Sequence, residues 1–148
     1  MLAELKNDLL FLLNILESIE KIHIYSKKVD TAEDFFYAND QLNFNASLTL
    51  LANIGENVGK ISSELKNKNP DIQWQDIKDF RNKIAHDYIG IDIFIVFRII
   101  QNELESLKKR VFLLIAEELK NKNFDEKEFQ LARESYYYRH IPFSEIAS

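Results

Sequence analysis

Three residues within one short stretch of this 148-residue chain, Arg81, His86 and Tyr88, suit chemistry on a phosphate group. An arginine guanidinium binds phosphate oxygens through a planar fork of donors. A histidine titrates near neutral pH and can give or take a proton during catalysis. The chain has three histidines and no cysteine, so this stretch holds an unusual share of its reactive side chains. It is the first place to look for a site.

These side chains do not share one face of an unbroken helix. At about 100° per residue, Arg81 and His86 are about 140° apart, whereas Arg81 and Tyr88 nearly eclipse. Convergence of Arg81 with His86 requires a helix that loosens after about Ala85, or a site that a second chain completes. The plainer interpretation is a surface arginine and a helix-terminal histidine that interacts with the helix dipole. Spacing alone leaves both interpretations open.

The pattern Arg81-Asn82, three further residues, then His86-x-Tyr88 resembles the active-site motif of the HEPN superfamily. More specifically, it is similar to the HepT-type ribonuclease toxins of HEPN/MNT toxin–antitoxin pairs, in which a tyrosine stands two residues after the histidine. The resemblance covers about residues 2–114. Neighbouring features agree with it: the lead-in Trp74 and Ile77, the segment Gly90-Ile91-Asp92, and Ile54-Gly55-Glu56.

The resemblance implies a metal-independent ribonuclease without a cofactor, in which a ribose 2′-hydroxyl attacks the adjacent phosphate. By that analogy Arg81 stabilises the phosphate charge and His86 moves a proton. Asn82 donates to the phosphate or orients His86, Lys83 adds positive charge, and Glu56 is a candidate partner of Arg81. Family members usually act as homodimers whose motifs face each other, which supplies two histidines, one as base and one as acid.

Tyr88 has two interpretations. The resemblance implies that it lies at the mouth of the site, where an MNT-type nucleotidyltransferase antitoxin silences the toxin by attaching AMP. The added charge and bulk would oppose the binding of an RNA phosphate. Alternatively, the ring closes the core beside Phe80 and the hydroxyl meets solvent.

Two other functions stay open. One is a non-catalytic HEPN module that binds a nucleotide or a partner enzyme. The other is an unrelated helical assembly protein, which would make the spacing of the motif accidental.

Composition narrows the class of protein. Hydrophobic residues make up 46% and charged residues 29%, as in one globular domain. No apolar run reaches the roughly 20 residues that span a bilayer, and the N-terminus does not resemble a secretory signal, so we expect a cytoplasmic protein. The histidines are scattered without paired carboxylates, so no metal site is expected. The net charge of −5 confines any RNA contact to a local patch, predicted around Arg81 and Lys83, or to a surface built from two chains.

Few glycines and prolines, together with apolar residues at helical spacing, predict an all-α fold. With the resemblance, we expect an up-and-down HEPN-like bundle of four to five helices over residues 1–120. Residues 121–148 are expected to form a C-terminal extension. It contains the run Tyr136-Tyr137-Tyr138, which could stack on RNA bases, pack on the bundle or form a dimer contact. The expected helices are 2–27, 32–37, 44–65, one from about Trp74 that Gly90 ends, one capped by Asp92, and 126–138, with a loop over 66–70.

Gly55 and Gly59 fall inside the second long helix, where each costs about 1 kcal/mol relative to alanine. Glycines in such places indicate a close approach of another backbone. We expect that approach to be helix packing within the chain rather than contact with a dimer mate.

Overall fold

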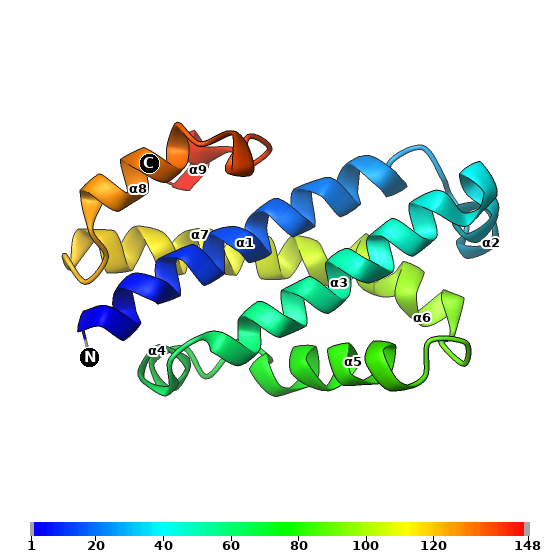
Figure 1. Ribbon diagram of the computed structural model, residues 1–148, viewed down its shortest axis with the longest axis horizontal. Helices are drawn as coiled ribbons and strands as arrows, with labels where there is room; N and C mark the ends of the chain where they lie inside the picture. The colour runs from blue at the N-terminus through cyan, green and yellow to red at the C-terminus, as the bar shows by residue number, and fades with distance from the viewer. Residues whose placement is uncertain (1, 147–148) are drawn as a thin grey trace.

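The computed structural model describes residues 2–146, with side chains from residue 8 onward, and that part of the chain is helical without a strand. The all-α bundle with a short C-terminal helical extension is confirmed (Figure 1). The order of elements is α1 Leu2–Ser26, α2 Ala32–Tyr37, η1 Ala38–Gln41, α3 Leu42–Lys60, α4 Ser63–Lys68, α5 Trp74–His86, α6 Ile93–Arg98, η2 Ile99–Glu103, α7 Leu104–Lys120, α8 Glu126–Arg133, η3 Tyr136–Tyr138 and α9 Phe143–Ile146.

The apolar stripes of the long helices meet in one core. Figure 1 shows α3 beside α1, with α5 antiparallel to α3 on the outer side and α7 behind. Burying such stripes contributes roughly 1.5–3 kcal/mol per large side chain. The following residues from α1, α3 and the α6–α7 segment are all at most 8% exposed: Leu9, Leu12, Leu16, Ile19, Leu48, Leu51, Ile54, Val58, Val96, Ile100, Leu104, Val111 and Leu114.

Polar side chains fix how α3 lies on α1. Asn14 donates to the Asn57 side chain at 3.0 Å, and Asn53 donates to the hydroxyl of Ser18 at 2.9 Å. Hydrogen bonds between partly buried groups lose much of their value if a helix rotates or slides. They therefore hold the rotation of α3, and with it the face that α3 presents to α5.

Three predicted helix starts are confirmed by their capping bonds. The Thr31 hydroxyl accepts from the backbone N–H of Asp34 at 3.1 Å, and the Asp92 carboxylate accepts from that of Phe94 at 2.8 Å. Asp125 caps α8 in the same way. Each cap satisfies a backbone donor that the helix itself leaves free.

The second long helix was predicted to continue to Leu65, and this is wrong. It ends at Lys60, and Ser62 caps the separate helix α4, which occupies part of the predicted 66–70 loop. Next to the break, the carboxylate of Asp8 on α1 accepts from the Ser62 N–H at 2.8 Å and from the Ser62 hydroxyl at 2.6 Å, and these bonds stabilise the start of the new helix. Leu65 is still fully buried.

Three further boundaries differ from the prediction. The helix of the motif ends at His86, before Gly90, because the backbone leaves helical geometry at Asp87 (φ −143°, ψ 52°). The helix capped by Asp92 contains a π-helical turn at Ile99–Glu103. The terminal helix stops at Arg133, since Ser135 caps a separate 3₁₀ turn over Tyr136–Tyr138.

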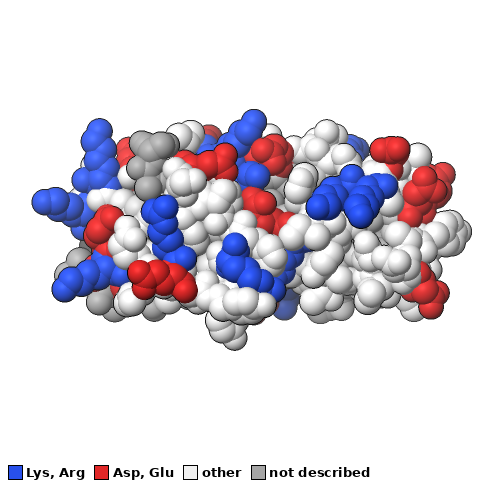
Figure 2. Space-filling view, turned by 90° about the horizontal axis from the view of Figure 1, so that it is seen from above, with Lys and Arg blue, Asp and Glu red and all other residues white. Residues whose placement is uncertain are grey.

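The C-terminal segment is attached to α1 by polar contacts. The Tyr138 hydroxyl donates to the Asn14 side chain at 2.8 Å, and His140 meets the buried carboxylate of Glu17 through its backbone N–H at 3.0 Å and its ring Nδ1 at 2.5 Å. Tyr136 and Tyr137 remain exposed. On the face that carries this segment, positive and negative side chains are interspersed (Figure 2).

No helix within residues 2–146 combines the length and the apolar composition needed to cross a membrane.

Candidate active site

The candidate site is built where α3 and α5 pass close to each other. A Cβ placed on Gly55 of α3 would lie 2.2 Å from Cβ and 2.8 Å from Cγ of Arg81, and 3.2 Å from the carbonyl oxygen of Ile77. No side chain fits in that space, so the close approach predicted for Gly55 is helix packing within the chain. At Gly59 the nearest atom would be Cε of Lys78 at 4.0 Å, an ordinary contact.

Arg81 is held by two side chains at this crossing. Its Nη2 forms an ion pair with Glu56 at 2.8 Å, and its Nη1 donates to Asn82 at 3.1 Å. The Arg81 side chain is 35% exposed, and that of Glu56 is 47% exposed. A guanidinium has five N–H donors, so these bonds leave others for a ligand. The site is therefore an oriented, solvent-accessible cation.

His86 is the last residue of α5 and lies exposed. The helix is unbroken from Trp74 to His86, so it does not loosen after Ala85. Arg81 and His86 of one chain therefore stay about 140° apart around the helix. Asn82 and Lys83 lie on exposed positions of the same helix.

Tyr88 lies in the loop that follows α5. Its hydroxyl donates to the side chain of Asn45, in the first turns of α3, at 2.6 Å, and the residue is 49% exposed. The hydroxyl is thus bound to another side chain, and not to solvent alone. Next to it, Ile89 is 98% exposed. No sequence signal indicated Asn45, because it is 43 residues from Tyr88.

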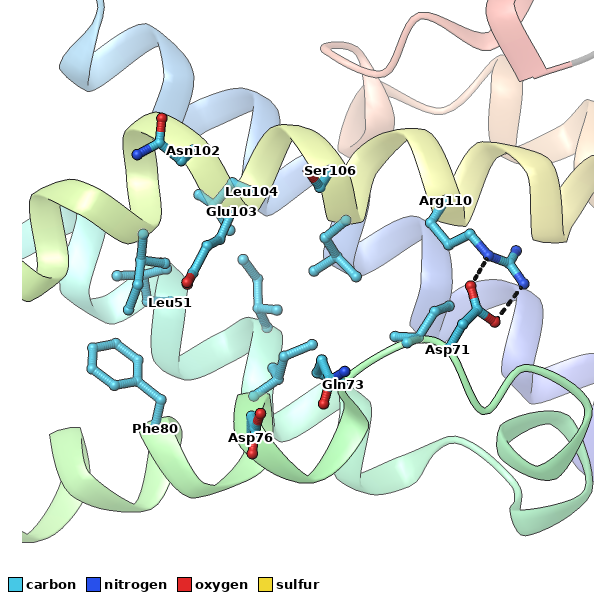
Figure 3. Close-up of a pocket in the computed structure, with 15 residues that line it drawn as sticks. Leu51, Asp71, Gln73, Asp76, Phe80, Asn102, Glu103, Leu104, Ser106 and Arg110 are labelled. Carbon is cyan, nitrogen blue, oxygen red and sulfur yellow. Dashed lines mark hydrogen bonds and ion pairs between the residues drawn. The ribbon is translucent and has the colours of Figure 1, made fainter.

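An apolar groove of about 610 Å³ lies on another side of α5, between it and the η2–α7 segment (Figure 3). Ile77 and Phe80 line it, together with apolar residues of α3 and α7, whereas Arg81 and His86 do not. Polar side chains at its rim include Asp76, Glu103 and an Asp71–Arg110 ion pair with a 2.6 Å bond. Carboxylates there repel an RNA phosphate. The groove is therefore a poor place for the substrate of a phosphate-directed site.

Comparisons with known proteins identify the family. The model of the family "Ribonuclease HepT-like" matches residues 15–113. The chain belongs to this family, which confirms the predicted relationship to HepT-type HEPN ribonucleases and the enzyme class, a ribonuclease. The matched range includes Gly55, Glu56, Arg81, His86 and Tyr88, and excludes the C-terminal extension.

Individual relatives carry similar names. "Probable ribonuclease HepT" of Thermococcus cleftensis is 30% identical over 98 residues, which are 66% of this chain and 86% of that protein. A Methanocaldococcus jannaschii protein named as a candidate RNase is 30% identical over 101 residues, 68% of this chain and 90% of its own length. A longer protein of that organism, named as a gamma-glutamylcyclotransferase and candidate RNase, is 30% identical over 114 residues, 77% of this chain, and this match covers 50% of its length. No solved structure matches the chain significantly.

Proposed function

We propose that this chain is the toxin of a toxin–antitoxin pair and that it cleaves RNA without a metal ion. The observation that carries the chemical part is the partly exposed Arg81 guanidinium, oriented by Glu56 and seated against Gly55, five residues before the exposed His86. A fixed guanidinium and a free imidazole are what an attack on a phosphodiester requires. Membership of a ribonuclease family supports RNA as the substrate.

In the proposed reaction the ribose 2′-oxygen attacks the adjacent phosphorus, and the bond from phosphorus to the 5′-oxygen breaks. The products are a 2′,3′-cyclic phosphate and a free 5′-hydroxyl. A base takes the proton from the 2′-hydroxyl, and an acid gives a proton to the leaving 5′-oxygen. Arg81 stabilises the charge that builds on the phosphate oxygens, because its donors are already positioned.

We assign base and acid to His86 and to His86 of the partner subunit in a homodimer. The unbroken α5 helix supports this assignment, since one chain does not bring its own Arg81 and His86 to the same face. The dimer has one cleft with two arginines and two histidines.

The products and the metal requirement test this chemistry. With the purified chain and a single-stranded RNA, we expect cleavage to persist in EDTA. Mass spectrometry should find 2′,3′-cyclic phosphate ends, and polynucleotide kinase should label the new 5′-hydroxyls directly. Cleavage that requires an added metal ion, or fragments with 3′-hydroxyl and 5′-phosphate ends, would contradict the proposal. Binding of RNA or nucleotide without cleavage would favour the non-catalytic module instead.

For inhibition, we propose that an MNT-type nucleotidyltransferase attaches AMP to Tyr88. The phenolic oxygen attacks the α-phosphorus of ATP, pyrophosphate leaves, and the phenolic proton passes to solvent. The half-exposed position of Tyr88 supports access to this oxygen. The product carries a negative phosphodiester in the loop after α5, and its oxygen no longer has a hydrogen to donate to Asn45, so the hydrogen bond from the Tyr88 hydroxyl to α3 is lost.

Labelled ATP tests this assignment. With the antitoxin and ATP labelled in the α-phosphate, the wild-type chain should incorporate label, and Tyr88→Phe should incorporate none because it lacks the attacking oxygen. Tyr136→Phe is the matched control, since Tyr136 is also an exposed tyrosine, and it should be labelled like wild type. Full labelling of Tyr88→Phe would contradict the assignment.

A further inference from the structure

A second group of basic side chains lies beside the candidate site. Lys78 is three residues before Arg81 on α5, so the two side chains project from the same side of the helix. Lys78 reaches over α3, where its Cε lies 4.0 Å from the position that a Cβ on Gly59 would occupy. Lys66, on α4, lies close enough to Lys78 for the two charges to interact. Lys66, Lys78 and Arg81 therefore come from two neighbouring helices and face one region.

Lys66 and Lys78 carry like charges that act on each other. Burial lowers the pKa of Lys66, and the ammonium of Lys78 lowers it further, against a smaller opposing effect of Asp8. Among the side chains that the structure describes, neither lysine forms an ion pair, whereas Lys21, Lys68 and Lys108 all do. Like charges held near each other repel, and an anionic ligand between them would relieve that repulsion.

No acid among the described side chains forms an ion pair with Lys66 or Lys78, although Asp8, which accepts two hydrogen bonds from Ser62, partly offsets the charge of Lys66. Glu56 is paired with Arg81, and Asp79 accepts from Gln75 at 2.8 Å. Asp76 lines the apolar groove on another side of α5. Lys83, by contrast, is about 160° around the helix from Arg81, so its charge points elsewhere within one chain. The basic side of α5 thus extends from Arg81 toward the α4 end.

We propose that Lys66 and Lys78 bind the RNA phosphates next to the one that Arg81 holds, so that a single strand lies along α5 between the cleavage site and α4. This inference rests on the proposed function of Arg81. Lysines give a phosphate a point charge without reading a base, so the track is for the RNA backbone and not for a sequence. Such a track would let a chain with a net charge of −5 bind RNA, because the positive charge is gathered where the strand lies.

Salt dependence of binding tests the track. The probe is a single-stranded 2′-O-methyl RNA, which lacks the attacking hydroxyl and stays intact with the wild-type chain. Removing one phosphate contact from a single strand should reduce the slope of log Kd against log salt by about 0.7. If the variant and the wild type bind equally at 1 M salt, the variant then binds about five-fold more weakly than the wild type at 0.1 M salt. We expect this reduction of the slope in Lys78→Ala and in Lys66→Ala. In the double variant the two reductions should add. Lys78→Arg, which keeps the charge, should retain the wild-type slope.

Lys127→Ala is the matched control, since Lys127 is an exposed lysine on α8, in the C-terminal segment. It should bind the probe with wild-type Kd and slope. Thermal unfolding of every variant checks the fold. Wild-type Kd and slope in both Lys66→Ala and Lys78→Ala would overturn the inference, even if the wild-type chain cleaves RNA. A wild-type chain that binds the probe through these lysines but cleaves no RNA would support the track and overturn the proposed reaction instead.

Discussion

Replacing His86 by alanine is expected to lower kcat for RNA cleavage at least about 100-fold, because positioned proton transfer contributes about 10²–10⁴ in rate. Arg81→Ala is expected to lower kcat by a similar factor, since a preorganised donor to the developing charge contributes about 10²–10³. His86 is exposed at a helix end, so its removal should leave the thermal unfolding temperature unchanged. Single-turnover cleavage of a defined RNA measures both effects.

A mixture of wild-type and His86→Ala chains reveals whether two histidines serve one cleft. After unfolding and refolding at equal concentrations, about one quarter of symmetric dimers contain two wild-type chains. If base and acid come from different subunits, activity should fall to about that quarter of an all-wild-type sample. Independent sites within each chain would leave about half, and that result would contradict the shared cleft. Mixing wild type with Lys127→Ala, treated in the same way, controls for losses during refolding.

Gly55→Ala is expected to disable the enzyme through the position of Arg81. The added methyl would lie 2.2 Å from the Arg81 Cβ and 3.2 Å from a backbone oxygen of α5, so the two helices must separate. A misplacement of about 1 Å at a catalytic group reduces kcat/KM by about 10². Overpacking should also lower the free energy of unfolding by about 1–3 kcal/mol, although alanine favours a helix more than glycine does. Cleavage kinetics and denaturant unfolding measure the two effects.

Gly59→Ala is the control, because it makes the same change on the same helix one turn away. Its methyl would find Lys78 Cε at 4.0 Å, an ordinary contact. We expect wild-type cleavage and a gain of up to about 1 kcal/mol in stability from helix propensity. If both glycine variants cleave RNA equally well, the close approach at Gly55 has no part in positioning Arg81.

The part of the site that could be predicted lies within one short segment, α5 and the loop that follows it. The spacing of Arg81, His86 and Tyr88 is a property of consecutive residues, and the family resemblance depends on it. Helix starts at Thr31 and Asp92 were likewise predictable, because a capping side chain bonds a backbone group two or three residues away. That Lys78 and Arg81 lie side by side also follows from local spacing, since side chains three residues apart on a helix project from the same side.

Contacts between helices were decided by the tertiary structure. Glu56 pairs with Arg81, Tyr88 bonds Asn45, and Asp8 bonds Ser62, 54 residues away along the chain. The two residues of each pair are far apart along the chain, so neither helical spacing nor a capping pattern relates them. Each depends on how far apart two helices lie and how each is rotated, which the buried side chains of the whole bundle set together. The chain's local pattern therefore determined which residues could do the chemistry, and the packing of α3 against α5 decided which of them are held in place for it.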